Sequence, residues 1–185
     1  MSACPINGAP LKFRLLDFWR WSVSGILSNA TRGRLAEFIV ATAVGVDTQC
    51  VREEWSAFDL ELPTGIRLEV KSAAYLQAWF QRGLSTISFS TKAARHWDSE
   101  TNQQAIAAGR HADAYVFCLL HHQDKATVNP LNLSQWTLYV LATPELTAYT
   151  RSQHSITLNW LQKLTPAVTY SDLNTEVGRK IATQV

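Results

Sequence analysis

The clearest pattern of hydrophobic and polar positions lies between residues 58 and 71, where the two kinds alternate. Alternation with a period of two predicts β-strands that each have one apolar face. The apolar positions are Phe58, Leu60 and Leu62 in a first strand and Ile66, Leu68 and Val70 in a second. Pro63 and Gly65 favour a three-residue turn between these strands, so the pattern predicts a β-hairpin.

The polar face of this hairpin brings two carboxylates together. A three-residue turn pairs Leu62 with Ile66. The same register sets Asp59 opposite Glu69, with Lys71 two residues further along on the same face. Like charges directly opposite each other destabilise a sheet. A divalent cation held between the carboxylates reverses that penalty, so the pattern indicates a candidate metal site.

Periodicity and turn residues predict further helices and strands along the chain. A first helix is expected over 11–27, packing on the body of the protein. A second is expected from a cap at Ser28 or Thr31 to about Val44, with Gly45 as a stop. One or two short helices are expected within Lys92–Ala108, and two more at Leu158–Leu164 and Ser171–Ala182. Strands are expected at Cys50–Arg52, Ser85–Ser90, Ala112–His121 and Trp136–Thr143, whereas residues 73–83 fit either a helical turn or an irregular crossing.

This order of elements predicts an α/β protein, a single domain over residues 1–185 with a mixed central β-sheet flanked by helices. The core of the domain is expected at about 30–142, with a loose arm at 1–10 and a helical part at 155–185. A chain of 185 residues, 46% of them hydrophobic, is long and apolar enough to bury a core of its own.

Cysteine usage and hydropathy predict a cytoplasmic protein. Cys4, Cys50 and Cys118 are an odd number at wide spacing, which suits reduced intracellular thiols in a core. No run of residues approaches the roughly 20 apolar positions of a membrane span, and the N-terminus lacks a signal pattern. We therefore expect no association with a membrane.

Charge and motifs narrow the chemistry. The net charge is only +2, so any contact with nucleic acid must come from a local basic patch. Glycine-rich phosphate loops are missing, which argues against a nucleotide cofactor, and no nucleophile elbow indicates acyl transfer. The neighbouring His121 and His122 have no Cys, His or Glu partner at ligand spacing, which argues against zinc.

A helix bearing Glu37, then Asp59, then Glu69-Val70-Lys71 on a hairpin resembles the PD-(D/E)XK nuclease superfamily, which has the restriction-endonuclease-like fold. The resemblance covers roughly residues 30–142 and includes the signature Asp-x9-Glu-x-Lys. An apolar residue precedes each acid, as is usual in the superfamily. Phe58 stands where many members have Pro.

The resemblance implies a Mg²⁺-dependent deoxyribonuclease, an endonuclease rather than an exonuclease. It assigns Asp59, Glu69, the carbonyl of Val70 and Glu37 as ligands of Mg²⁺, with Mn²⁺ as a substitute. Lys71 would be the catalytic cation and Glu37 an accessory acid. Carboxylate oxygens are hard ligands that suit Mg²⁺. A metal ion and an ammonium group stabilise the negative charge that develops during phosphodiester hydrolysis.

DNA is the expected partner. Arg32 and Arg34 flank the helix acid and are candidates for phosphate contacts, with ordinary surface charges as the alternative. Ser72 and Gln77 follow the catalytic strand, where polar residues of several superfamily members support the site or contact the substrate backbone. One small domain has little room for a separate base-reading module. Strong sequence specificity would therefore require a homodimer or a partner that supplies recognition.

Other basic and aromatic residues have less defined roles. Lys92, Arg95 and Arg110 would extend a basic track past the site. Trp79 and Trp97 are interpreted as core or rim aromatics rather than as platforms for stacked bases.

Two alternatives remain open at this level. A catalytically silent protein of the same fold would bind nucleic acid or a protein partner without cleavage. An unrelated α/β protein would carry the acidic hairpin as surface decoration, with Asp59 and Glu69 solvated or paired with Arg67 and Lys71. Metal binding separates the nuclease from the unrelated protein, and cleavage separates it from the silent one.

Overall fold

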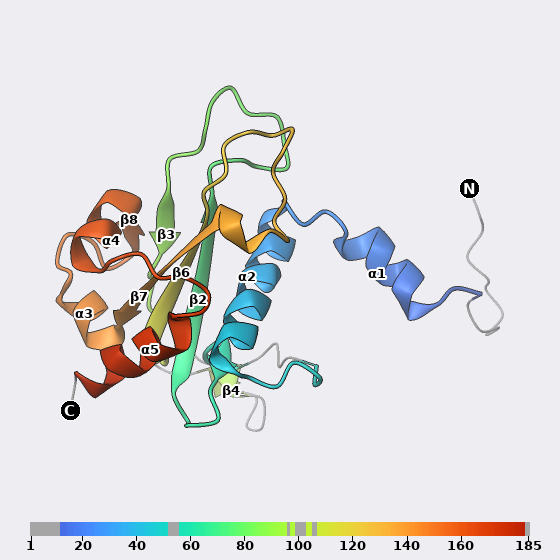
Figure 1. Ribbon diagram of the computed structural model, residues 1–185. Coiled ribbons are helices and arrows are strands. Elements are labelled where there is room, and N and C mark those ends of the chain that lie inside the picture. Colours follow the sequence, from blue (N-terminus) through green and yellow to red (C-terminus); the bar gives the residue numbers. More distant parts are fainter. Residues whose placement is uncertain (1–11, 52–55, 96, 99–102, 105–106, 184–185) are drawn as a thin grey trace.

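The protein is an α/β domain built on a mixed four-stranded sheet (Figure 1). The computed structural model describes residues 12–51, 56–95, 97–98, 103–104 and 107–183. The helices are α1 (Leu15–Val23), α2 (Asn29–Val44), α3 (Thr143–Ala148), α4 (Leu158–Leu164) and α5 (Leu173–Ala182), with one 3₁₀ turn at Leu133–Gln135. The strands are β1 (Leu60–Glu61), β2 (Arg67–Ala74), β3 (Ser88–Ser90), β4 (Trp97–Asp98), β5 (Gln103–Gln104), β6 (Ala114–Leu120), β7 (Trp136–Ala142) and β8 (Ser155–Thr157).

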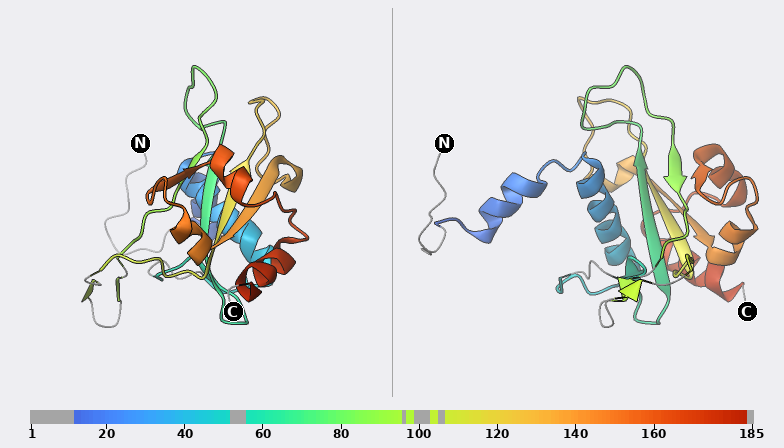
Figure 2. Two further views of the ribbon diagram at one scale, coloured as in Figure 1. Left: turned by 90° about the vertical axis from the view of Figure 1, so that its left-hand side faces the viewer. Right: turned by 180° about the vertical axis from the view of Figure 1, so that it is seen from behind.

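The main sheet has the strand order β1-β2-β6-β7. β1 runs antiparallel to β2, β2 parallel to β6, and β6 antiparallel to β7, so the predicted mixed sheet is confirmed. β3 pairs with β8 in a separate two-stranded sheet beside it (Figure 2). Every residue of β6 is buried, because layers of structure cover both faces of this central strand.

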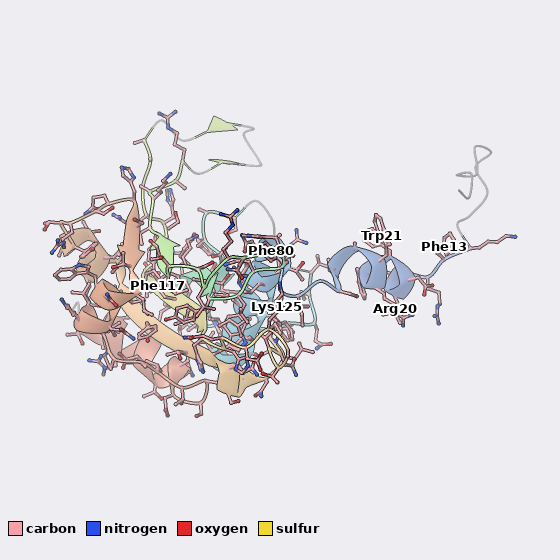
Figure 3. The ribbon with its side chains drawn as sticks, turned by 90° about the horizontal axis from the view of Figure 1, so that it is seen from above. Phe13, Arg20, Trp21, Phe80, Phe117 and Lys125 are labelled. Atoms are coloured by element: carbon pink, nitrogen blue, oxygen red, sulfur yellow. The ribbon has the colours of Figure 1, made fainter. Side chains whose placement is uncertain are left out.

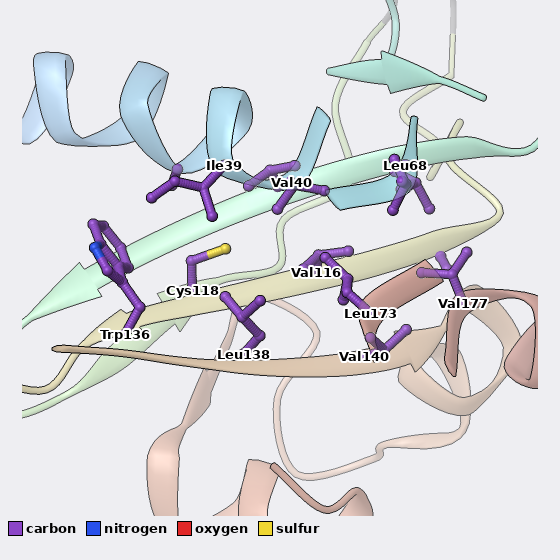
Figure 4. Packing of buried hydrophobic residues seen from close by; sticks show 14 of the residues in the cluster. Ile39, Val40, Leu68, Val116, Cys118, Trp136, Leu138, Val140, Leu173 and Val177 are labelled. Carbon is purple, nitrogen blue, oxygen red and sulfur yellow. The ribbon is translucent and has the colours of Figure 1, made fainter. Parts of the chain in front are cut away.

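Two hydrophobic clusters lie on the two faces of the main sheet. Helices α2 and α5 cover one face, where Ile39 and Val40 of α2 and Leu173 and Val177 of α5 pack on Val116 and its neighbours (Figure 4). The other face packs against β3, β8, α3 and α4 through residues that include Phe89, Phe117, Ile156 and Leu161. β2 therefore has one face toward α2 and the opposite face toward β3.

The ends of α2 agree with the sequence prediction. The Ser28 side chain accepts a hydrogen bond from the N–H of Thr31 over 3.4 Å, which makes Ser28 the N-cap. Gly45 ends the helix with a φ of 78°, a left-handed conformation that glycine adopts without strain. α4 also has the predicted bounds, and α5 begins within two residues of its predicted start.

Helix α1 differs from the prediction that residues 11–27 pack on the body. The helix forms only over Leu15–Val23, none of its nine residues, all of them described, is buried, and it projects away from the sheet (Figures 1 and 2). None of the helices in the described residues is long and apolar enough to cross a membrane.

The segment Lys92–Ala108 was predicted as helical, and this prediction is wrong for the residues that the structure describes. Ala94 and Gly109 exchange two backbone hydrogen bonds of 3.0 Å, and the chain between them forms the short antiparallel pair β4–β5. Helix propensity is a weak preference, and this pairing of distant backbone groups overrides it.

Two further predictions need correction, and one helix was not predicted. A strand was predicted at Cys50–Arg52. Cys50 and Val51 are exposed and belong to no strand among the described residues, and Arg52 lies outside the described residues. Cys50 is therefore an exposed free thiol, whereas Cys118 is buried as expected. Helix α3 was missed although Pro144 and Glu145 in its first turn are ordinary start signals in a sequence. In the structure the Glu145 side chain accepts a hydrogen bond from the N–H of Ala142.

Candidate active site

The hairpin forms with the predicted register. Leu60 lies opposite Leu68 and Glu61 opposite Arg67, and Asp59 lies directly beyond the last pair of this ladder. The turn is closed by a bond of 2.8 Å from Gly65 N–H to the Leu62 carbonyl, and Gly65 has a φ of 81°. The glycine is required at this position because other residues rarely adopt a positive φ.

Asp59 leaves the regular ladder and places its carboxylate at the edge of β2. Its N–H donates to the Leu68 carbonyl over 3.0 Å, and its Oδ2 accepts a bond of 2.7 Å from the backbone N–H of Val70. In an antiparallel ladder the N–H and C=O of a residue point to the same neighbouring strand. The carbonyl of Val70 therefore faces the edge at which the Asp59 carboxylate lies.

Glu69 and Lys71 lie on the face of β2 opposite to α2. Leu68 and Val70 pack toward α2, and alternation turns the two charged residues to the other side. Glu69 accepts a hydrogen bond from the Lys71 ammonium, and the two side chains are only 21% and 30% exposed. The Glu69–Lys71 ion pair is one of the pairings that the surface-decoration interpretation also includes, although both side chains are largely covered rather than solvated.

The pKa of Glu69 is raised above the ordinary value of a glutamate. Burial is the main cause and the neighbouring negative charge of Asp59 is the second, while Lys71 and His111 act in the opposite direction. A carboxylate whose proton affinity is raised by a neighbouring negative charge also attracts a cation. Together with the Val70 carbonyl, Asp59 and Glu69 would offer only oxygen donors, the kind of ligand that Mg²⁺ takes while it keeps several waters.

Arg67 does not neutralise this pair. Its guanidinium makes two bonds to the Asp113 carboxylate, of 3.1 Å and 2.7 Å, and its backbone N–H donates to the same group over 2.8 Å. This interaction ties the start of β2 to the start of β6, and it was not foreseen from the sequence. The pKa of Asp113 is lowered, first by the hydrogen bond from the Arg67 side chain.

Tyr115 is a neighbour of the site that the sequence analysis missed. It is the residue of β6 level with Glu69, and it is almost fully buried. Burial raises the pKa of Tyr115 to about 12, and the charges of Glu69 and Asp59 act in the same direction, whereas Arg110 lowers it. A lone tyrosine in an apolar strand gives no signal of this position, because the parallel pairing of β2 with β6 is a long-range feature.

Glu37 lies on the other side of Asp59. Both side chains line a pocket of about 550 Å³ between α2 and the described residues of 46–51 and 56–61, and Glu69 and Lys71 are not among its lining residues. Asp59 is therefore the acid that lies both next to Glu69 and at the pocket that contains Glu37. Within the described part of the chain no group of three or more His, Cys, Asp or Glu side chains is arranged to hold a metal. The candidate cation set is accordingly the carboxylate pair with a backbone oxygen.

The four predicted substrate contacts lie in different places. Arg32 and Gln77 are buried together, with Arg32 Nη1 3.5 Å from Gln77 Oε1, and burial lowers the pKa of Arg32. Arg32 also binds the Leu27 carbonyl and the Asn29 side chain. Arg34 lines the pocket beside Glu37.

Ser72 differs from Lys71 by one position, so it faces the α2 side of the sheet. The structure thus brings together Asp59, Glu69, Val70 and Lys71, and Glu37 adjoins only Asp59. Their chemical roles stay predictions.

The fold and this carboxylate pair define an α/β protein with a candidate cation site on a hairpin. A family model described as bacteriophage T4 endonuclease IV matches residues 20–160 of the chain. The match covers well over half of the 185 residues, so the protein belongs to the bacteriophage T4 endonuclease IV family. A comparison with curated proteins gives no match.

Proposed function

We propose that this protein is a metal-dependent DNA endonuclease of the PD-(D/E)XK type. Membership of an endonuclease family supports the reaction class. The observation that carries the site is the hydrogen bond from Val70 N–H to Asp59, because it holds Asp59 beside the strand on which Glu69 and Lys71 form their ion pair. A restriction-endonuclease-like fold is supported by α2 packed on β2 and by the mixed sheet that begins with the β1–β2 hairpin.

Asp59, Glu69 and the Val70 carbonyl would hold Mg²⁺, or Mn²⁺ in its place, with Glu37 as an accessory acid. When bound, such an ion supplies Lewis-acid stabilisation of the charge that develops on the phosphate oxygens. The Lys71 ammonium donates to Glu69, and it would lie beside the same oxygens and add to that stabilisation. Glu69 keeps the Lys71 ammonium oriented, so each member of the pair positions the other.

The connection between β2 and β6 does not contribute to this proposal. Among the described residues it contains β3, within the predicted strand Ser85–Ser90, and the β4–β5 pair, where the sequence had predicted helix. The assignment to the PD-(D/E)XK type therefore rests on the hairpin and its charges.

Cleavage of circular and linear DNA with and without Mg²⁺ tests the proposed function. We expect Lys71→Met and Glu69→Gln to abolish metal-dependent cleavage. Lys163→Met on α4 and Glu176→Gln on α5 are matched controls that remove the same groups far from the hairpin, and they should cleave like the unchanged protein. Cleavage that survives both hairpin substitutions would place the active site elsewhere. Tight DNA binding without cleavage by any form would favour the catalytically silent alternative.

A further inference from the structure

Helix α1 carries a basic and aromatic surface that nothing in the protein covers among the described residues. Its large apolar side chains and that of the preceding Phe13 are exposed, Trp21 to 85%. The exposed members are Phe13, Leu15, Leu16, Phe18, Trp19 and Trp21. Three basic residues, Lys12, Arg14 and Arg20, accompany them, against the single acid Asp17, which pairs with Arg14.

Such a helix is unfavourable without a partner. Isolated helices shorter than about 12 to 15 residues are marginal in water, and α1 has nine. A contiguous exposed apolar patch of this kind marks a binding surface. Figure 3 shows Arg20 and Trp21 on the projecting helix and Phe13 on the segment just before it, clear of the body of the protein.

A second exposed surface of the same composition lies on the loop after β2. Trp79 is 55% exposed and Phe80 86%, next to the exposed Arg82. Lys125, from the loop after β6, donates a bond of 3.2 Å to the Trp79 carbonyl and so joins this surface. Trp79 is therefore not a core aromatic, and its partial exposure fits the rim position that the sequence analysis allowed.

The loop holds these rings out in a defined way. Gln81 donates to the Tyr75 carbonyl over 3.1 Å and to the Ser85 hydroxyl over 3.0 Å, and it accepts a bond of 2.6 Å from the N–H of Gln77. The tip that carries Phe80 is therefore braced from inside by amide side chains. Exposure of its aromatic residues is a property of an ordered loop.

The two surfaces lie at the same end of the molecule. Arg32 at the start of α2 bonds to Gln77 at the base of the loop, and the chain runs from that end of α2 out to α1 (Figures 1 and 3). β2 also ends here, at Ala74, three residues beyond Lys71. A rise of about 3.3 Å per strand residue puts Lys71 roughly 10 Å below this end of the strand.

We propose that α1 and the loop at 79–82 form a DNA-binding surface, on which aromatic side chains stack against unpaired bases and basic side chains contact phosphates. The inference rests on the proposed function, which makes DNA the substrate. Both surfaces combine rings with positive charge, and this composition is typical of sites that follow a nucleic-acid strand. A second copy of the chain is the poorer partner, because it would set one positive surface against another.

The test measures binding of labelled single-stranded and duplex oligodeoxynucleotides without Mg²⁺. We expect Trp21→Ser and Phe80→Ser each to weaken single-strand binding by about 5- to 100-fold, with a smaller effect on duplex. Arg20→Gln should reduce the slope of log affinity against log salt concentration by the amount that corresponds to about one phosphate contact. Leu164→Ser on α4 removes an exposed apolar side chain elsewhere and should bind DNA normally.

Three outcomes separate this inference from its alternatives. Unchanged DNA affinity in Trp21→Ser and Phe80→Ser would overturn it, and loss of a dimer in sedimentation of the same variants would assign α1 to a second copy. An equal loss of duplex binding would overturn the stacking of unpaired bases. Failure of the proposed function is a different result, in which Lys71→Met leaves cleavage unchanged while the aromatic variants still lose binding.

Discussion

The carboxylate of Asp59 accepts a hydrogen bond from the backbone N–H of Val70 over 2.7 Å, at the point where the β1–β2 ladder stops. In a continued ladder a backbone carbonyl would occupy this place. One side chain thus completes the hydrogen bonding of β2 and also brings a negative charge beside Glu69. Structural and chemical roles of Asp59 are therefore separable by substitution.

Asp59→Asn and Asp59→Ala should separate these two roles. Asparagine keeps an oxygen acceptor for Val70, so we expect near-normal stability but a loss of cleavage of about 100-fold or more, because the charge is gone. Alanine leaves the Val70 N–H unsatisfied and should cost a further ~1–3 kcal/mol in the free energy of unfolding. Denaturant unfolding and cleavage rates of the two variants provide the measurement. Equal stability of both variants would show that the hydrogen bond contributes little.

Glu69 gives the protein a stability that depends on pH in the absence of metal. Its pKa is raised in the native state, so the native state binds this proton more tightly than the unfolded chain does. Stability from this group is fully present below the ordinary pKa of a glutamate and is lost as the pH rises through the raised pKa of Glu69. The free energy of unfolding of Glu69→Gln, taken relative to that of the unchanged protein, should therefore be higher at neutral pH than at acidic pH.

Unfolding titrations between about pH 4 and pH 8 measure this difference. Glu176→Gln is a control of opposite sign, because the hydrogen bond from Arg179 lowers the pKa of Glu176. Its native-state contribution is present above the ordinary pKa and is lost as the pH falls through the lowered pKa. The same direction of change in both variants would contradict the assignment of Glu69.

Mg²⁺ should stabilise the folded protein through the carboxylate pair. An ion that binds only the native state adds ~2.7 kcal/mol when its concentration is 100 times the dissociation constant. We expect this gain in the unchanged protein and in Lys71→Met, but not in Glu69→Gln or Asp59→Asn. Thermal unfolding with and without the ion is the measurement, with Glu61→Gln as the control on the same hairpin. Stabilisation that persists in both carboxylate variants would place the cation elsewhere.

The hairpin was predictable because all of its determinants are local. The turn at Gly65 and the alternation of apolar residues fix the register, and the positions of Asp59 and Glu69 follow from it. Tyr115 was not predictable as a neighbour of Glu69, because it depends on pairing between strands more than 40 residues apart. Arg32 looks like a surface cation in the sequence, yet Gln77 and the Leu27 carbonyl bind it in a buried position that only the tertiary structure creates.

Asp113 should contribute more to stability than an ordinary surface acid. Its carboxylate accepts two bonds from the Arg67 guanidinium and one from the Arg67 backbone N–H. Both side chains are partly exposed, so the ion pair itself is expected to add no more than ~1 kcal/mol. Asp113→Ala also removes the acceptor of the backbone N–H and should therefore unfold at lower denaturant concentration than Arg67→Ala. A reversed order would mean that the backbone bond is satisfied by water.

Tyr115→Phe tests whether the tyrosine hydroxyl takes part in proton transfer. The pKa of Tyr115 is raised to about 12, so the hydroxyl stays protonated throughout the range in which cleavage would be measured. It therefore cannot act as a base there, and we infer that Tyr115 contributes by packing beside Glu69 across the β2–β6 pairing. We expect Tyr115→Phe to lower the cleavage rate while leaving the shape of its pH dependence unchanged. The ring contacts with Phe117 are kept, so the free energy of unfolding should fall by only ~1 kcal/mol. A shift of the pH profile in this variant would give the hydroxyl a direct part in the chemistry.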